Sequence, residues 1–484
     1  YMGLKKKVNK HIETPLLNVL KKYANTNSVR FHMPGHKARP AGHIFEEFKE
    51  NLFKWDVTEI PGLDDLHQPR GPIKRAQEKL AELYGADKSF FLVNGATSGV
   101  IAMMGAAIAP DDEILISRAS HRSVLSGLII TGGRPVYVMP ERWQEFGVYT
   151  QVSPKAVAEA LEQNPKIKAV LLTNPVYQGF CPDLGAISKL VRSINKLLLV
   201  DEAHGPHFGF SFRLPMCAGK VADAWVQSPH KMLTSFTQSA WLHVRGNKID
   251  QNRLQDFLHL VTTTSPSYIL MASLDASRAV MELNGKTLVK RALALADKAR
   301  YGINKFTPFY CIGTEVKGKN GIYDIDLSRL MVNVSQAGYT GYQVEKILRK
   351  RFNIYAEYAD LYNIYFLITF SNNSSDINRL IKALSALKAR TKIPKSIIWP
   401  DKLPKKALEP KAAFYSIGEH VPLKQSLGRV IKEALVPYPP GIPLLMPGEI
   451  MEKEHIEVLT ALLKSGGYCQ GITPEGFIQA VFNA

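Results

Sequence analysis

Short apolar runs alternate with longer amphipathic segments from about residue 46 to residue 245. Short apolar runs are typical of strands buried on both faces of a sheet, and amphipathic segments are typical of the helices that cover such a sheet. The expected strands include SFFLV, EILIS, PVYVM, AVLLT, LLLVD, AWVQ and AWLHV, and the expected helices include PKAVAEALEQN and LGAISKLVRSIN. This alternation predicts an α/β fold with a mainly parallel sheet that is flanked by helices on both faces.

The pattern divides the chain into four expected parts. Residues 1–45 predict an N-terminal helix and an irregular arm, because FHMPGHKARPAG is rich in Pro and Gly. Residues 46–300 are expected to form the large α/β domain, which ends in a long helix. Residues 301–395 have the pattern of a smaller α/β domain. Residues 396–484 are expected to form a C-terminal domain, in which VPYPPGIPLLMPGE has too many prolines for a helix or a central strand.

Polar clusters follow several of the expected strands directly. They are NGATSG, SHRS, DEAHG and SPHK. Ligands of open α/β sheets bind at the carboxyl ends of the strands, so these clusters are expected to surround one site. The small-residue helix that follows the first strand is expected to begin near Thr97.

The DEAH cluster is also a helicase signature, and this alternative needs a separate test. A nucleotide-driven motor requires a phosphate-binding GxxxxGK[ST] loop before the acidic strand end. The GKT at residues 285–287 comes after DEAH, and the position of the required earlier glycine holds Val280. Residue type and order therefore both argue against a helicase.

Composition narrows the class of protein further. The net charge of +18 is spread along the chain, apart from a short run at residues 5–7, so it predicts neither a nucleic-acid partner nor a membrane partner. No apolar run has the length of a membrane span, and we expect a cytoplasmic protein. The cysteines form no CxxC pair, which predicts reduced thiols and no metal site; they are Cys181, Cys217, Cys311 and Cys469.

The four clusters together offer groups that suit one cofactor. Thr97 and Ser98 at a helix start suit a phosphate, and the flat ring of His121 can stack on an aromatic ring. Asp201 can hold a protonated ring nitrogen, and Lys231 can form a Schiff base with an aldehyde. Each residue alone has an ordinary structural explanation, but their joint placement predicts pyridoxal 5'-phosphate.

Longer motifs carry a specific resemblance. In order, they are FHMPGHK, DVTEIPGLDDLHQPRGPI, SHRSVLSGL, DEAHGPHF, SPHKMLTSFTQSAWL, TTTSPSYILMASLDASR and YPPGIPLLMPGE. From about residue 11 to residue 470 the chain resembles the Orn/Lys/Arg decarboxylases, pyridoxal-phosphate enzymes of fold-type I, and among them the short bacterial biosynthetic arginine decarboxylases. The resemblance implies an aspartate-aminotransferase-type fold with a C-terminal decarboxylase domain. It also implies a homodimer or a multiple of dimers, and conversion of L-arginine to agmatine and CO2 in polyamine biosynthesis. Lysine and ornithine stay open as substrates.

The resemblance also assigns roles to residues of the four clusters. It makes Lys231 the lysine that bonds to the cofactor, with His230 beside it and Ser228 near the phosphate that Thr97 and Ser98 bind. Three further positions surround the ring: Asp201 at its nitrogen, His121 stacked over it, and Ala203 with His204 lining it. One departure is Pro229, where the family usually has Thr or Val. Proline removes a backbone donor and restricts Ser228.

The substrate side is less specific in the sequence. Asp64 and Asp65 could bind a basic side chain, contributed across a dimer interface, or could form a loop salt bridge with Arg70 or Lys74. Glu449 is a further candidate for binding the substrate. Either His230 or Lys231 could return a proton to Cα. Two alternatives from other classes remain, an aminotransferase or aldolase-type enzyme on the same fold and a noncatalytic relative; the intact lysine motif argues against the second.

Overall fold

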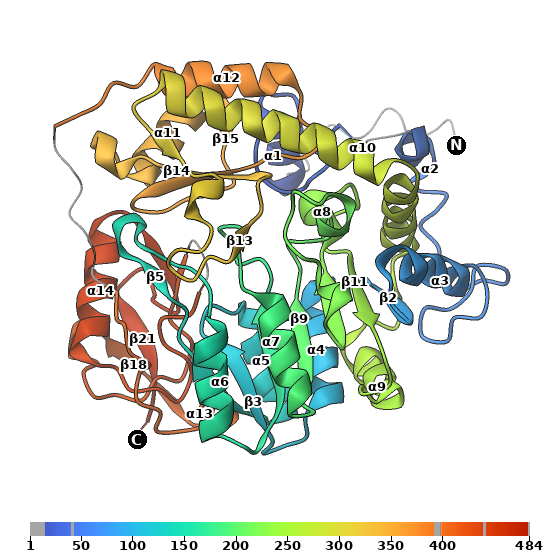
Figure 1. Cartoon of the computed structure of the whole chain (residues 1–484), viewed down its shortest axis with the longest axis horizontal. Coiled ribbons are helices and arrows are strands. Elements are labelled where there is room, and N and C mark those ends of the chain that lie inside the picture. Colours follow the sequence, from blue (N-terminus) through green and yellow to red (C-terminus); the bar gives the residue numbers. More distant parts are fainter. Residues whose placement is uncertain (1–14, 40–42, 392–396, 398, 439–441, 483–484) are drawn as a thin grey trace, which may run out of the picture.

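The structure is a computed structural model that describes residues 15–39, 43–391, 397, 399–438 and 442–482. Figure 1 shows a large sheet with its helices in the lower half and a smaller sheet under two long helices at the top. The C-terminal elements lie beside the large sheet, on the left of the view.

The large sheet has seven strands in the order β2-β11-β10-β9-β7-β3-β4. Their bounds are β2 Lys88–Leu92, β3 Glu113–Ser117, β4 Arg134–Val138, β7 Ile167–Thr173, β9 Leu197–Asp201, β10 Ala224–Gln227 and β11 Ala240–Val244. Strand β11 runs antiparallel to both of its neighbours, whereas β10, β9, β7, β3 and β4 pair in parallel. The predicted mainly parallel sheet is confirmed.

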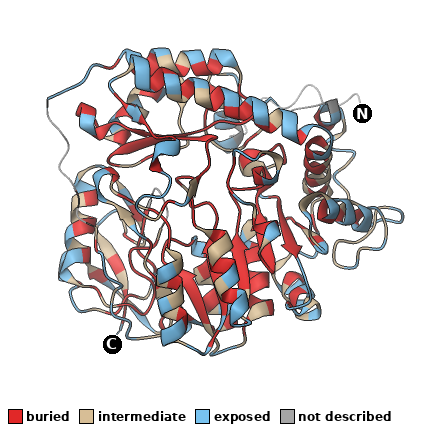
Figure 2. Cartoon of the chain, viewed as in Figure 1, coloured by how far each residue is buried: buried red, intermediate tan, exposed pale blue. Residues whose placement is uncertain are grey.

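Alternating side chains explain why these strands are apolar throughout. Ile114 and Ile116 pack with the helices on one face, α4 (Gly95–Ala107), α5 (Arg122–Thr131) and α9 (Gln251–Val261). Leu115 between them packs with α6 (Pro154–Gln163) and α7 (Leu184–Ser193) on the other face. Because both faces are covered, every position of the strand after Glu113 is buried. Figure 2 shows this burial concentrated in the large sheet and on the inward sides of its helices.

The smaller sheet is antiparallel and has the order β12-β14-β17-β16. It consists of β12 Tyr310–Cys311, β14 Arg329–Asn333, β16 Tyr358–Ala359 and β17 Asn363–Leu367. Its core is shared with α10 (Tyr268–Phe306), α11 (Gly341–Phe352) and α12 (Ser374–Ser385). Helix α10 runs from the edge of the large sheet to the smaller one (Figure 1), so it connects the two layers.

The C-terminal residues form a separate apolar core. Their elements are α13 Pro410–Tyr415, β18 Gly418–Pro422, β19 Val436–Tyr438, α14 Lys453–Lys464, β20 Tyr468–Gln470 and β21 Phe477–Val481. The proline-containing strand β19 pairs with β20 alone, which agrees with the expectation that this segment forms no central strand. Within the described ranges, no helix combines the length and apolar character that a membrane crossing requires.

The remaining elements are short or lie at the periphery. They are α1 Pro15–Ala24, β1 Val29–Arg30, α2 Glu47–Asn51, α3 Pro72–Tyr84, β5 Arg142–Trp143, β6 Val148–Tyr149, β8 Phe180–Cys181, α8 Pro229–Met232, β13 Asp324–Ile325 and β15 Ile354–Tyr355. Two details differ from expectation. Strand β1 of the arm pairs in parallel with β15, which follows α11, and α4 begins at Gly95 rather than near Thr97. The start of the arm, residues 1–14, lies outside the described residues, and the four domain boundaries stay predictions.

Candidate active site

The four polar clusters meet at one cavity of about 250 Å³ at the carboxyl ends of the parallel strands. Each cluster contributes to its lining because each follows a strand of the same sheet. The residues of the clusters that line it are Gly95, Ala96, Thr97, Ser120, His121, Ser123, Asp201, Ala203, His204, Ser228, His230 and Lys231. Of the residues predicted to contact the cofactor, Ser98 does not line the cavity. It is buried, and its hydroxyl donates to the carbonyl of Gly95 at 2.8 Å.

Lys231 lies on the short helix α8 after β10. Pro229 occupies the first helical position, where its fixed φ suits the helix and its missing N–H costs no helical hydrogen bond. The departure from the family pattern is therefore compatible with the local backbone. Burial lowers the pKa of Lys231 to about 8, against the nearby Asp201, which raises it. About a tenth of Lys231 is thus a neutral amine at pH 7, and about half of it at pH 8.

Three histidines line the same cavity, and their hydrogen bonds fix which ring nitrogen carries the proton. His121 accepts the backbone N–H of Ser123 on Nδ1 at 3.2 Å, which leaves the proton on Nε2. His230 has Nδ1 at 2.8 Å from the carbonyl oxygen of Ser239, so Nδ1 carries its proton and Nε2 is free to accept. Burial, with the charge of Lys231, lowers the pKa of each to about 4. Both rings are therefore neutral near neutral pH.

His204 lies against the lysine. Its Nε2 is 2.9 Å from Nζ of Lys231, and its Nδ1 is 2.6 Å from Nη2 of Arg329 on β14. Burial and the positive charges of Lys231 and Arg329 hold the pKa of His204 well below its usual value.

The two carboxylates of DEAH have different surroundings. Asp201 ends β9 and lines the cavity, and one of its oxygens accepts the N–H of Ala203 at 3.0 Å. Glu202 does not line this cavity; it accepts from Gln227, Asn174 and the N–H of Ala218 at the buried end of the sheet. Asp201 is therefore the carboxylate that a ligand can reach, and Glu202 orders the neighbouring strand ends.

Two buried hydroxyls in the cavity lack partners. Within the described part of the chain, neither Ser120 Oγ nor Thr173 Oγ1 has a hydrogen-bond partner, and both residues line the cavity. Leaving a buried hydroxyl unpaired costs free energy. A polar ligand in this cavity would supply the missing hydrogen bonds.

Sequence reasoning missed several residues of the site. Tyr177 and Ile442 line the cavity, and Arg329 reaches it through His204. Tyr177 follows the strand β7 and could have been found as a strand-end polar group. Arg329 stands in the apolar stretch SRLMVNV, and Ile442 in the Pro-rich C-terminal segment, so neither has a local signal.

Neither Asp64 nor Asp65 lines this cavity in the same chain. Asp64 accepts backbone N–H groups of Arg70, Gly71, Ile73 and Lys74 at 2.7 to 3.3 Å. It thus satisfies free donors at the start of α3, and this contact differs from the side-chain salt bridge that was the alternative to substrate binding. Asp65 accepts the N–H of His67 at 2.8 Å.

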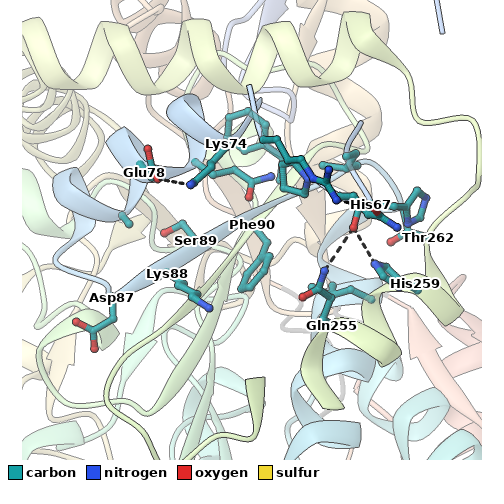
Figure 3. Close-up of a pocket in the computed structure, with 18 residues that line it drawn as sticks. His67, Lys74, Glu78, Asp87, Lys88, Ser89, Phe90, Gln255, His259 and Thr262 are labelled. Carbon is teal, nitrogen blue, oxygen red and sulfur yellow. Dashed lines mark hydrogen bonds and ion pairs between the residues drawn. The ribbon is translucent and has the colours of Figure 1, made fainter. Parts of the chain in front are cut away.

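A second cavity of about 440 Å³ adjoins this loop (Figure 3). Its labelled walls include Lys88, Ser89 and Phe90 of the edge strand β2 and Gln255 and His259 of α9. None of the residues predicted for the cofactor lines it, so the lysine cavity is the candidate active site.

Glu449 also has a structural partner. Its two oxygens lie 2.7 and 2.6 Å from the guanidinium of Arg118, and its side chain is 2% exposed. Glu449 does not line the lysine cavity. A role in substrate binding therefore has no geometric basis within this chain, whereas a role in joining the C-terminal core to the large domain does.

Comparison with known proteins agrees with this geometry. The family model for the Orn/Lys/Arg decarboxylase major domain matches residues 14–326, and the model for the C-terminal domain of the same family matches residues 397–475. The arginine decarboxylase of Bacillus subtilis is 38% identical over 95% of both chains, and the inducible lysine decarboxylase of Escherichia coli is 26% identical over 97% of this chain and 80% of its own. The crystal structure of Francisella novicida lysine decarboxylase superposes with a TM-score of 0.77 at 22% identity, covering 98% of this chain and 82% of that one. The expected aspartate-aminotransferase-type fold is confirmed, and the chain belongs to the Orn/Lys/Arg decarboxylase family.

Proposed function

We propose that the protein is a pyridoxal-phosphate-dependent decarboxylase that converts L-arginine to agmatine and CO2. The observation that carries the proposal is the Lys231 side chain in a cavity that is also lined by Asp201 and the start of α4. The 38% identity to an arginine decarboxylase, against 26% to a lysine decarboxylase, favours arginine over lysine as the substrate. Lysine and ornithine stay alternatives.

The residues of the cavity fit the cofactor. The N-terminus of α4 has free backbone N–H groups for a phosphate, with the side chain of Thr97 beside them. Asp201 suits the ring nitrogen, and the unpaired hydroxyls of Ser120 and Thr173 can bond to polar groups of the ring. His121 is the flat ring that can stack.

Each residue then has a definite task. When bound, pyridoxal phosphate supplies an electron sink for the bond pair left on Cα as CO2 departs. Asp201 keeps the ring nitrogen protonated by a charge-assisted hydrogen bond. Lys231 binds the cofactor as a neutral amine and gives way to the amino group of the substrate. The buried walls around Lys231 exclude water from the reacting atoms.

The hydrogen bonds of the histidines favour Lys231 as the proton donor to Cα. Neutral His230 has a lone pair on Nε2, so it must first gain a proton before it can give one. Lys231, with a pKa of about 8, can both carry and release a proton near neutral pH. We therefore assign the return of the proton to Lys231.

The guanidinium of arginine needs an acidic partner, and Asp201 is already assigned to the ring nitrogen of the cofactor. Asp201 is the only carboxylate among the described residues that line the cavity. We propose that a second copy of the chain contributes the acidic loop, as members of this fold are expected to dimerise. Asp65 suits this task better than Asp64. The carboxylate of Asp64 already accepts four backbone N–H groups at and just before the start of α3, whereas that of Asp65 accepts the N–H of His67.

Matched substitutions in this loop separate the two roles. Asp65→Asn is expected to raise KM for arginine at least about tenfold, the effect of losing about 1.4 kcal/mol of charge pairing, with little loss of stability. Asp64→Asn is expected to lower the free energy of unfolding by about 1 kcal/mol and to leave KM nearly unchanged. Steady-state kinetics and urea denaturation of both variants measure the difference. An unchanged KM in Asp65→Asn would contradict the substrate role.

The contribution of Asp64 should also depend on pH. Burial raises the pKa of Asp64, but its backbone N–H donors outweigh burial and lower the pKa below the ordinary value. Its stabilisation is thus present above the ordinary pKa of aspartate and is lost as the pH falls through the lowered pKa. The difference in stability between the wild type and Asp64→Asn should accordingly shrink at acid pH.

The reaction type is tested with arginine labelled with ¹³C at the carboxylate. Purified protein supplied with pyridoxal phosphate should release labelled CO2 and agmatine in equal amounts. An aminotransferase would instead give a keto acid that keeps the label. An aldolase-type enzyme would release an aldehyde from the side chain and leave the label in the remaining amino acid. Either of those products would overturn the proposal.

A further inference from the structure

A chain of contacts runs from Arg329 of the smaller sheet through His204 to Lys231, and Arg329 and His204 are buried while Lys231 is half-buried. Arg329 on β14 lies with Nη2 at 2.6 Å from Nδ1 of His204, and Nε2 of His204 lies 2.9 Å from Nζ of Lys231. The side chain of Arg329 is 3% exposed. Arg329 does not line the cavity itself.

Donor and acceptor roles along this chain follow from chemistry. A guanidinium is always a donor, so Nδ1 of His204 must accept and carries no proton. A neutral imidazole then carries its proton on Nε2, which becomes the donor to Lys231. Nζ of Lys231 can accept that proton only as a free amine, because an ammonium has no lone pair.

Arg329 is itself held in place by contacts on either side. Its Nε lies 3.2 Å from a carboxylate oxygen of the buried Asp326, and its Nη1 donates to the carbonyl of Tyr177 at 2.8 Å. The ring of Tyr177 lies edge-on to His204 at 4.9 Å. The guanidinium is therefore oriented by the protein before any ligand binds.

Other charges act on Lys231 from the surrounding elements. Asp201 on β9 and Glu357 before β16 favour its charged form, and Arg329 favours its neutral form. His121 at the start of α5 and His230 on α8 are neutral near neutral pH. The proton position on His204 Nε2 therefore determines whether Nζ of Lys231 accepts this hydrogen bond as an amine or donates it as an ammonium.

We propose that Arg329 is a positioning residue that fixes His204 in the Nε2–H tautomer and thereby favours the neutral amine form of Lys231 over the ammonium. A neutral amine is the form that attacks an aldehyde, so the arrangement prepares Lys231 to bind the cofactor and to recover it after the amine product leaves. The same tautomer prevents His204 from taking a proton from Lys231. The inference rests on the proposed function for its purpose, but its geometry and its test do not require turnover.

The tautomer is measured directly by ¹⁵N NMR of the full-length chain labelled at histidine, after removal of the cofactor with hydroxylamine. The His204 signals are assigned by their loss in His204→Gln. We expect a protonated Nε2 and an unprotonated Nδ1 from pH 6 to pH 9. A protonated Nδ1 in the wild type would overturn the proposal, and this result needs no other variant to fold.

The consequence for Lys231 is measured by its acetylation with acetic anhydride in the same cofactor-free protein, with peptide mass spectrometry as the readout. In Arg329→Gln, His204 can turn to the other tautomer and accept from an ammonium. The midpoint of the acetylation rate plotted against pH should move to higher pH. The acetylation rate of Lys231 near pH 7 should fall at least about tenfold, the equivalent of one pKa unit.

Arg300→Gln is the matched control. Arg300 donates to the carbonyls of Leu327 and Arg329 and supports the same strand without touching His204. Its pH profile should match the wild type. An unchanged profile in Arg329→Gln, or an equal shift in Arg300→Gln, would overturn the positioning role. Failure to form agmatine with the expected tautomer intact would count against the proposed function alone.

Discussion

Replacing Lys231 with alanine is expected to lower arginine decarboxylation at least about a thousandfold, because the variant loses both the amine that bonds to the cofactor and the assigned proton donor. The side chain points into a cavity and makes one hydrogen bond, to His204, so its removal should leave the fold intact. Agmatine release measures the activity, and circular dichroism checks the fold.

The matched control is Lys220→Ala. Lys220 is an exposed lysine in a short turn of the same domain, away from the cavity. It should retain wild-type activity. Retained turnover in Lys231→Ala, with Lys220→Ala unchanged, would remove Lys231 from the mechanism and with it the present assignment of the site.

The second large effect is expected at the buried ion pair between Arg118 and Glu449. Both side chains are nearly inaccessible, at 5% and 2%, and the pair is bidentate. Arg118 also donates to the carbonyl of Leu444, and Glu449 accepts the N–H of Met446. Removing one partner leaves a buried charge without compensation, so Arg118→Met or Glu449→Met should lower the free energy of unfolding by about 3 to 5 kcal/mol.

The double variant separates the charge effect from lost packing. Arg118→Met with Glu449→Met leaves no unpaired charge, so it should be less destabilising than the sum of the single changes. Urea denaturation of the four proteins completes the cycle. A Glu449→Met variant with normal stability and a raised KM for arginine would restore the substrate role for Glu449.

The local pattern of apolar and polar residues predicts those features of the fold that are set by residues close together in the sequence. The strand β9, LLLVD, is apolar because both faces are covered, and that run of residues already places Asp201 at its end. The four clusters could be brought together because consecutive parallel strands end at the same edge of a sheet. The antiparallel direction of β11 could not be predicted from AWLHV, since an apolar strand has no sequence signal for direction.

Contacts between distant segments could not be predicted from the same pattern. The motif FHMPGHK forms neither helix nor strand, as expected, and its Gly35 N–H donates to the carbonyl of His230 at 2.7 Å. A Cβ at Gly35 would lie 2.3 Å from the carbonyl oxygen of Leu233, so the arm packs directly against the turn that carries Lys231. Arg329 reaches His204 from the smaller sheet in the same way. The sequence neighbours of such residues do not indicate their contacts, which form only when the fold brings distant segments together.

The central claim is that this chain decarboxylates arginine at the Lys231 site, and a competition experiment tests it most directly. Purified protein with pyridoxal phosphate is given equal amounts of arginine, lysine and ornithine, and the amines are identified by mass spectrometry. We predict agmatine as the main product, with cadaverine and putrescine as minor ones or none. Cadaverine or putrescine as the main amine would contradict the choice of arginine, and the absence of any amine with the cofactor bound would contradict decarboxylation itself.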